Sequence, residues 1–179
     1  SVPLINVDDV WNITFNGSNI TGIGETVCII DTGIDYTHPS LGNGWGNKVI
    51  EGYRFLDNGA DYSSCGLVNS ECMDDYSHGT HVAGIVASDH PTYMGVAPDA
   101  KLISIKALNS EGSGYSTDIK AGIDWCVNNA SAFNISVISM SLGDCTNHNS
   151  YCNSDDYASS IDAAVEQGIA VIVSAGNCI

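Results

Sequence analysis

The stretch that decides the fold is residues 26–33, Thr26-Val27-Cys28-Ile29-Ile30-Asp31-Thr32-Gly33. Its first five residues show no alternation of polar and apolar side chains, a pattern typical of a strand buried on both faces. The Thr-Gly pair predicts a turn, which would hold the preceding carboxylate at the rim of a sheet. Because that is a poor place for a structural aspartate, we interpret Asp31 as a functional residue.

Strands and helices are predicted to alternate along the chain. Similar short runs at residues 101–108, 135–140 and 169–174 predict further strands. Helical spacing is seen in residues 78–88, with Val82, Ile85 and Val86 facing the core, in Ile119, Ile123, Val127 and Ala130, and in Ala158, Ile161, Ala164 and Val165. Ser116 or Thr117 is expected to cap the second helix and Gly168 to end the third. Such βαβ units favour an α/β three-layer sandwich, a mainly parallel sheet flanked by helices.

No domain boundary is visible, so residues 1–179 are expected to form one domain. Residues 57–76 and 144–156 are polar and are predicted to be surface loops. Hydrophobic residues make up 44% of the chain, and five Lys and Arg against 21 Asp and Glu give 5 − 21 = −16. This charge excludes nucleic acid and an anionic membrane surface as expected partners.

An extracellular, mature protein is indicated by three features. No apolar run approaches the roughly 18 residues of a membrane-spanning helix, and residues 1–6 lack the pattern of a signal peptide. Seven cysteines favour an oxidising setting. Asn-x-Ser/Thr sequons begin at Asn12, Asn16, Asn19, Asn129 and Asn134. We therefore expect a secreted glycoprotein.

Three polar groups are expected to meet at the carboxyl edge of the sheet, where reactive groups gather in open α/β folds. Asp31 and Asn177 follow predicted strands, and His78 begins a predicted helix in the heptad of residues 78–84. A carboxylate, an imidazole and an amide are three of the four parts of a Ser-His-Asp hydrolase. The carboxylate orients the imidazole, the imidazole transfers protons, and the amide stabilises an oxyanion.

The motifs around these residues resemble those of the subtilisin-like serine peptidases (subtilases). Five motifs occur in family order: Asp31-Thr32-Gly33-Ile34-Asp35 with His38-Pro39, the His78 heptad, Gly95-Val96-Ala97-Pro98, Ser139-Met140-Ser141-Leu142-Gly143 and Ala175-Gly176-Asn177. The resemblance extends from about Val7 to the end of the chain. It implies an endopeptidase in which Asp31 is the triad carboxylate, His78 the general acid and base, and Asn177 the oxyanion donor.

The resemblance also implies a substrate-binding surface. Two backbone segments, Gly112-Ser113-Gly114 and Ser141-Leu142-Gly143, are similar to those that sandwich an extended substrate by strand pairing. The alternative for them is an ordinary tight turn and a strand end. Asp74 is expected either to contact the substrate side chain preceding the cleaved residue, favouring basic groups there, or to lie in a solvated loop.

The nucleophile motif of the family, a Gly-Thr-Ser ahead of a helix, is absent from the chain. We therefore expect residues 1–179 to be an incomplete subtilase catalytic domain, its N-terminal two thirds, which is inactive alone. The serine would come from a complementary C-terminal fragment, a separate chain or a continuation. Other expected partners are a peptide or protein substrate and a propeptide inhibitor.

Cysteine spacing predicts two local disulfides, Cys65 with Cys72 and Cys145 with Cys152, each pair seven residues apart. Cys28 and Cys126 lie in apolar segments and are interpreted as small buried side chains. Cys178 is expected to pair with the missing part.

The resemblance implies no cofactor for catalysis, while calcium is the family's usual structural ion. The family's calcium aspartate after His-Pro is Ser40 here, and residues 88–94 are short for the usual loop, so that site is expected to be missing. Asp74-Asp75 and Asp155-Asp156 are alternative clusters for calcium, or plain solvated surface.

Two competing functions stay open. The spacings of Asp35 to His38 and of His78 to His81 are ones that metals accept, which would make the protein a metallohydrolase. Alternatively, the chain is a catalytically dead, subtilase-like peptide-binding scaffold that lost its serine. Intact Asp31, His78 and Asn177 argue against such decay.

Overall fold

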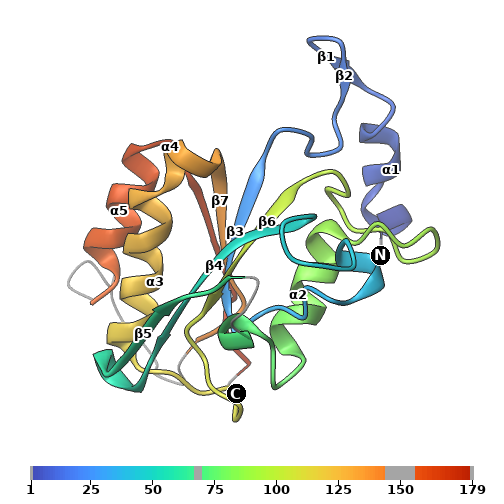
Figure 1. Cartoon of the computed structure of the whole chain (residues 1–179). Helices are drawn as coiled ribbons and strands as arrows, with labels where there is room; N and C mark the ends of the chain where they lie inside the picture. The colour runs from blue at the N-terminus through green and yellow to red at the C-terminus, as the bar shows by residue number, and fades with distance from the viewer. Residues whose placement is uncertain (1, 67–69, 144–155, 178–179) are drawn as a thin grey trace.

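The computed structural model describes residues 2–66, 70–143 and 156–177. Its main sheet has six strands in the order β5-β4-β6-β3-β7-β8, and Figure 1 shows helices on both of its faces. All neighbouring strands are parallel except β4 and β5, which are antiparallel. The predicted three-layer α/β sandwich with a mainly parallel sheet is confirmed.

The elements of the sandwich are the following. The strands are β3 (Thr26–Asp31), β4 (Val49–Leu56), β5 (Asp61–Ser64), β6 (Lys101–Lys106), β7 (Ile135–Met140) and β8 (Ala170–Val173). The helices are α2 (His78–Ala87), α3 (Ser116–Asn128), α4 (Ala130–Phe133) and α5 (Ala158–Glu166). The N-terminal segment adds η1 (Val2–Ile5), α1 (Val7–Val10) and the hairpin β1 (Thr14–Phe15) with β2 (Ser18–Asn19), and short 3-10 turns are η2 (Pro39–Leu41), η3 (Asp57–Gly59) and η4 (Ser70–Cys72).

Strand β3 runs through the middle of the sheet, and every one of its residues is buried. Cys28 and Ile30 pack into the core beneath α3 and α5, whereas Val27 and Ile29 pack into the core beneath α2. Successive side chains of a strand point to opposite faces. The continuous apolar run of β3 therefore follows from its having a core on each side.

Strands β4 and β5 were not predicted from the sequence. β5 lies inside the segment that we predicted to be a surface loop, and that prediction is wrong for these residues. Both strands carry polar side chains that obscure the pattern. Arg54 of β4, for example, pairs across the strands with Asp61 and lies 3.6 Å from a carboxylate oxygen of Glu71.

Helix α2 has the predicted position and part of the predicted core-facing side. Val82 and Val86 are partly buried and pack against the core beneath the helix, as predicted, but Ile85 does not. Gly79, Ala83 and Ala87 are its buried residues, whereas Ile85 is 52% exposed. The reason is steric: the helix approaches the sheet so closely that a Cβ on Gly79 would lie 2.1 Å from the carbonyl oxygen of Gly33. Only small side chains fit between the helix and the sheet at that separation.

The ends of α3 and α5 were predicted with different success. Helix α3 starts at Ser116 behind Tyr115 and has no side-chain cap, so the expected cap by Ser116 or Thr117 is wrong. The Thr117 hydroxyl donates instead to the side chain of Asn58, 2.6 Å away. Helix α5 ends as predicted, because Gly168 just beyond it adopts the left-handed conformation with φ of 81°.

Asp118 in the first turn of α3 fastens the turn η3. Its buried carboxylate accepts hydrogen bonds, each of 3.0 Å, from the backbone N–H groups of Asn58 and Gly59 and from the hydroxyl of Tyr62. Burial and the bond to Asp118 raise the pKa of Tyr62 to about 12. The neutral tyrosine is therefore the form that the fold stabilises, up to strongly alkaline pH.

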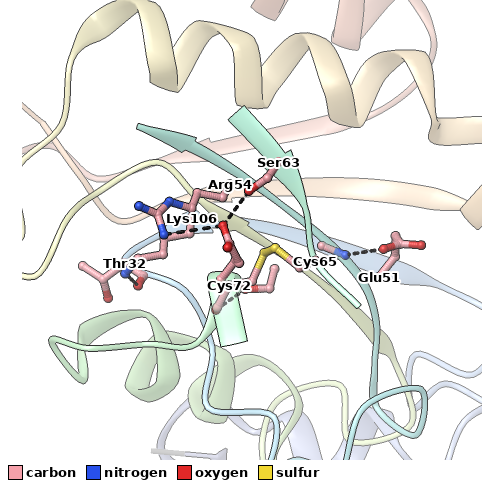
Figure 2. Close-up of a disulfide and its surroundings, with 10 residues drawn as sticks. Thr32, Glu51, Arg54, Ser63, Cys65, Cys72 and Lys106 are labelled. Atoms are coloured by element: carbon pink, nitrogen blue, oxygen red, sulfur yellow. Dashed lines mark hydrogen bonds and ion pairs between the residues drawn. A yellow bond between two sulfur atoms is a disulfide. The ribbon is translucent and has the colours of Figure 1, made fainter. Parts of the chain in front are cut away.

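The cysteine predictions are confirmed in one case and corrected in another. Cys65 and Cys72 form the predicted local disulfide (Figure 2). Cys28 and Cys126 are not separate buried thiols, because they form a disulfide that joins β3 to α3. The mistake arose because both residues sit in apolar segments 98 positions apart, and only the packing of α3 on the sheet brings them together. Cys145, Cys152 and Cys178 lie outside the described residues.

Within the described part of the chain, no helix is long and apolar enough to cross a membrane.

We predict that removing the Cys28–Cys126 disulfide lowers the free energy of unfolding more than removing Cys65–Cys72. The loops that the bonds close differ in sequence separation, 98 against 7 residues. The chain-entropy model gives losses of about 5 and about 2 kcal/mol for such loops. Urea denaturation of the two double Cys→Ala variants measures the difference, and equal losses would contradict the prediction.

Candidate active site

A buried carboxylate and a half-exposed imidazole form the centre of the site. Oδ1 of Asp31 lies 2.7 Å from Nδ1 of His78, and the side chains of the two residues are 1% and 43% exposed. The same oxygen accepts the backbone N–H of Thr32 at 2.7 Å. Because an ionised carboxylate only accepts hydrogen bonds, Nδ1 carries the proton and Nε2 is left as a base.

The pair forms because the end of β3 meets the beginning of α2. Asp31 is the last residue of β3 and His78 is the first residue of α2. Two glycines make the contact possible. Gly33 has a φ of 103° and no room for a Cβ beside the carbonyl oxygen of Cys72. A Cβ on Gly79 would lie 3.1 Å from the Cβ of Asp31. Larger residues would push the helix away from the carboxylate.

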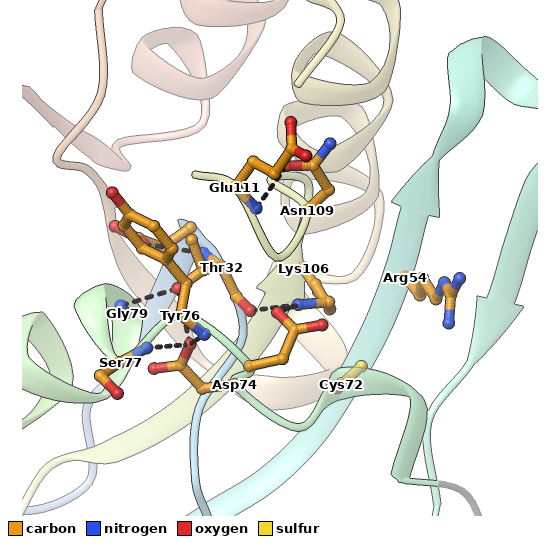
Figure 3. A network of polar contacts seen from close by, with 12 residues as sticks. Thr32, Arg54, Cys72, Asp74, Tyr76, Ser77, Gly79, Lys106, Asn109 and Glu111 are labelled. Atoms are coloured by element: carbon orange, nitrogen blue, oxygen red, sulfur yellow. Dashed lines mark hydrogen bonds and ion pairs between the residues drawn. The ribbon is translucent and has the colours of Figure 1, made fainter. Parts of the chain in front are cut away.

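Asp74 connects the two sides of this contact (Figure 3). Its carboxylate accepts hydrogen bonds from the hydroxyl of Thr32, the backbone N–H groups of Tyr76 and Ser77, and both the N–H and the hydroxyl of Thr80. A carboxylate offers about four lone-pair sites, so none is left over. The expectation that Asp74 faces a basic substrate side chain, or a solvated loop, is therefore revised: its carboxylate is committed to the protein.

The hydrogen bonds to Asp74 outweigh the effect of its burial. Burial alone would raise the pKa of this carboxyl, but the bonds from Thr80, Tyr76 and Thr32 hold the pKa below its ordinary value. The ionised form is thus the one that the fold stabilises. This contribution to stability is present above the unfolded-state pKa and is lost as the pH falls through the lowered, folded-state pKa.

Lys106 is a site residue that sequence reasoning missed. It lies opposite Asp31 in the parallel pairing of β6 with β3, and its side chain is only 3% exposed. Its Nζ donates to the carbonyl oxygen of Thr32 at 2.5 Å and to Oδ1 of Asp75 at 2.6 Å. The available signal was a lysine at the carboxyl end of a mostly apolar strand, a position where a buried charge needs partners.

Asn177 lies at the same edge of the sheet as the Asp31–His78 pair. It is exposed and follows β8, which is separated from β3 by β7. The segments after β7 and β8 are tied together, since the hydroxyl of Ser174 donates to the carbonyl oxygen of Leu142 at 2.7 Å and its N–H donates to that of Met140 at 3.1 Å. The predicted substrate segment Ser141-Leu142-Gly143 is thus held beside residues 174–177.

The other predicted substrate segment, Gly112-Ser113-Gly114, lies in a turn that Asn109 closes. The N–H of Asn109 donates to the carbonyl oxygen of Ser113 at 2.8 Å, and the N–H of Ser113 donates to the side chain of Asn109 at 3.1 Å. Gly112 has a φ of 74°, and a Cβ there would lie 2.9 Å from the ring of Tyr76. The N–H of Gly112 also donates to the carbonyl oxygen of Asn109, at 2.9 Å. Because the backbone of Ser113 and the N–H of Gly112 are bonded internally, strand pairing with a substrate would fall mainly to Gly114.

A calcium ion does not fit the acidic pair Asp74-Asp75. The carboxylate of Asp74 is filled by protein donors and that of Asp75 pairs with Lys106. The other acidic cluster, Asp155-Asp156, lies partly outside the described residues. Among the residues that the structure describes, no group of three or more His, Cys, Asp or Glu side chains is arranged to hold a metal ion.

The spacing of Asp35 and His38 likewise serves the local chain. Oδ1 of Asp35 accepts the N–H and hydroxyl of Thr37, and Nδ1 of His38 accepts the N–H of Ser40. Both side chains line a cavity of about 1070 Å³ beside α2, and His78 is not among its lining residues. The Asp31–His78 pair is the stronger candidate site, because an imidazole paired with a buried carboxylate is suited to proton transfer.

Comparison with known proteins identifies relatives of the chain. The model of the "Subtilase family" matches residues 22–178. The chain is 36% identical to the minor extracellular protease Vpr of Bacillus subtilis (strain 168), over 99% of this chain and 20% of that protein. It is 38% identical to subtilisin DY of Bacillus licheniformis, over 98% of this chain and 54% of the relative. Among solved structures, it matches sphericase with a TM-score of 0.71 and 32% identity, over 96% of this chain and 52% of that one.

The chain therefore spans a fifth to about half of the length of these relatives.

We predict that Gly79→Ala weakens the Asp31–His78 hydrogen bond, because the new Cβ would collide with the carbonyl oxygen of Gly33, 2.1 Å away. Gly84→Ala is the matched control on the same helix, since a Cβ there meets nothing within 4 Å. Alanine should stabilise the helix at that position, by up to about 1 kcal/mol. Thermal unfolding and the proton NMR signal of the His78 Nδ1–H report the two effects. Equal behaviour of the variants would refute the steric account.

Proposed function

Because this chain belongs to the subtilase family, we propose that it carries the acid–base half of the active site of a secreted serine endopeptidase. The observation that supports this most directly is the 2.7 Å hydrogen bond between the buried carboxylate of Asp31 and Nδ1 of His78. Among the known relatives, the names of Vpr and subtilisin DY are those of a protease and a subtilisin.

In the proposed mechanism, Nε2 of His78 takes the proton of a serine hydroxyl as the serine oxygen attacks the carbonyl carbon of the peptide bond. Asp31 stabilises the imidazolium that results, and the side-chain amide of Asn177 donates to the oxyanion. His78 then returns the proton to the leaving amine as the C–N bond breaks. In the second half of the reaction, His78 takes a proton from water as the water oxygen attacks the acyl carbon. His78 then returns the proton to the serine oxygen as the ester bond breaks, and no cofactor takes part.

The nucleophilic serine is proposed to lie outside these 179 residues, in a continuation or a complementary C-terminal fragment. Strand β8 supports this proposal: its apolar residues Ile172 and Val173 are 59% and 49% exposed, although strands of parallel sheets are normally covered on both faces. A further segment packed over β8 would cover these side chains and lie next to Asn177. That is where a serine attacking the carbonyl would be needed.

The proposed substrate is a peptide or protein in extended form, bound between Gly112-Ser113-Gly114 and Ser141-Leu142-Gly143. A propeptide inhibitor would occupy the same surface. Secretion is supported by the two disulfides and by the name of the extracellular relative Vpr. The proposal also includes glycans, expected from the sequence at the sequons Asn12, Asn16, Asn19, Asn129 and Asn134. A structural calcium ion is expected from the family alone.

We predict that the purified 179-residue chain alone does not hydrolyse a peptide substrate. The full-length protein, or the chain mixed with its complementary fragment, should hydrolyse it and be labelled by a serine-directed fluorophosphonate on the added segment. Intact mass spectrometry locates the label. Activity of the chain alone would contradict the proposed missing serine. A full-length protein that binds peptides without labelling would indicate the dead scaffold, and zinc-dependent activity would indicate a metallohydrolase.

We further predict separate kinetic effects for two site residues in the active protein. Asp31→Asn should lower kcat by about 10⁴ because the imidazole would take the wrong tautomer. Asn177→Ala should lower kcat by roughly 10²–10³, with little change in KM, because the oxyanion loses a donor. Steady-state kinetics with a chromogenic peptide measure both. A variant that kept full kcat would remove that residue from the mechanism.

A further inference from the structure

Asp74 accepts hydrogen bonds from residues next to both members of the Asp31–His78 pair. Its Oδ1 accepts the hydroxyl of Thr32, which follows Asp31, at 2.8 Å, and the N–H of Ser77, which precedes His78, at 2.8 Å. Its Oδ2 accepts the N–H and the hydroxyl of Thr80, in the first turn of α2, at 2.8 and 2.5 Å. One carboxylate thus joins the end of β3 to the beginning of α2 (Figure 3).

The hydroxyls that bind Asp74 extend this link by one more step. Thr32 Oγ1 accepts the N–H of Gly79 at 3.0 Å, and Thr80 Oγ1 accepts the N–H of Asp35 at 2.9 Å. Each hydroxyl donates its hydrogen to Asp74, and this orients the lone pairs of the hydroxyl oxygen toward these N–H groups. The residues on both sides of His78 are therefore fixed to the turn that follows Asp31.

The backbone before His78 needs such support. Ser77 has a φ of 74°, in the left-handed region that residues other than glycine rarely adopt. The bond from its N–H to Asp74 holds this conformation. The N–H of Thr80 is one of the donors at the start of α2 that lack a partner within the helix, and a negative charge is favourable at a helix N-terminus. The direction in which the side chain of His78 projects from the backbone thus depends on the carboxylate of Asp74.

We propose that Asp74 is a positioning residue that sets the Asp31–His78 hydrogen bond by fixing the neighbours of both residues to one carboxylate. It touches neither the substrate nor the reacting atoms. The consequence of this positioning for catalysis rests on the proposed function, whereas the effect of Asp74 on the orientation of the imidazole does not. Misplacing a catalytic group by about 1 Å can reduce the rate by about 10²-fold, so the arrangement matters for turnover.

The test compares Asp74→Asn with Asp118→Asn. Asparagine keeps the size of the side chain but presents an NH₂ group to N–H and O–H donors that need an acceptor. Asp118 is the matched control, because its buried carboxylate also accepts two backbone N–H groups and a hydroxyl, at η3 and β5. Both variants are expected to lower the denaturation midpoint.

The readout is the imidazole itself. In ¹⁵N-histidine-labelled chain, with His78 assigned by its disappearance in His78→Gln, Asp74→Asn should weaken or remove the Nδ1–H signal and shift the Nδ1/Nε2 tautomer ratio. Asp118→Asn should leave both unchanged. An unchanged His78 in Asp74→Asn, or an equal change in Asp118→Asn, would overturn the proposal.

Two further measurements complete the test. If Asp74→Asn does not fold, Thr32→Val is the second variant. It removes the bond between Asp74 and the turn after Asp31, together with the acceptor of the Gly79 N–H that this bond orients. It should change the His78 signals in the same direction, and unaltered signals would overturn the proposal. In the active protein, Asp74→Asn should lower kcat by about 10–100-fold with KM nearly unchanged, and Asp118→Asn should not. An altered imidazole in a protein without peptidase activity would uphold the positioning role while refuting the proposed function.

Discussion

The close approach of α2 to the end of β3 is the constraint on which the rest of the site depends. A hydrogen bond of 2.7 Å between Asp31 and His78 requires the first turn of the helix to lie almost against the strand. Gly79 and Gly33 permit this at the site, and Ala83 and Ala87 continue a face of small side chains along the helix. The fully buried residues of the helix are therefore small ones, while Val82 and Val86 pack at the edge of the core and Ile85 is exposed.

Charge burial at this edge of the sheet is compensated by polar partners on neighbouring segments. Lys106 is nearly fully buried, and its ammonium is held by the carbonyl oxygen of Thr32 and the carboxylate of Asp75. The loop that carries Asp75 is anchored in turn, because the carbonyl oxygen of Cys72 accepts the N–H of Ile34 at 3.1 Å and Cys72 is bonded to Cys65. Unpaired, the lysine would be expensive to bury. The disulfide, the loop and the turn after β3 thus support one another.

Sequence alone predicted the parts of the molecule that local pattern determines. The apolar run of β3, the position of α2 and the turn glycine Gly168 all have local signals, and the motifs around Asp31 and His78 indicated that these two side chains would meet. The rest depended on contacts between distant segments. The partner of Cys28 follows only from how α3 packs. The strand β4 is obscured by Arg54, whose partner Asp61 lies on β5. The inward orientation of Asp74 follows from donors at Thr32 and Thr80, in two different parts of the chain.

The two sides of the candidate site differ in how far this chain completes them. Around β3 the carboxylate of Asp31 is buried, and its bond to His78 is held in place by Gly79 and by Asp74, which lie among the described residues. An unpaired buried carboxylate would be costly. Around β8 the apolar residues Ile172 and Val173 are exposed, and Asn177 lies in solvent beyond them. The orientation of the imidazole is therefore a property of the described residues themselves. A serine supplied over β8 would meet a base that is already oriented, and its arrival would have to order only the side of the site that contains Asn177.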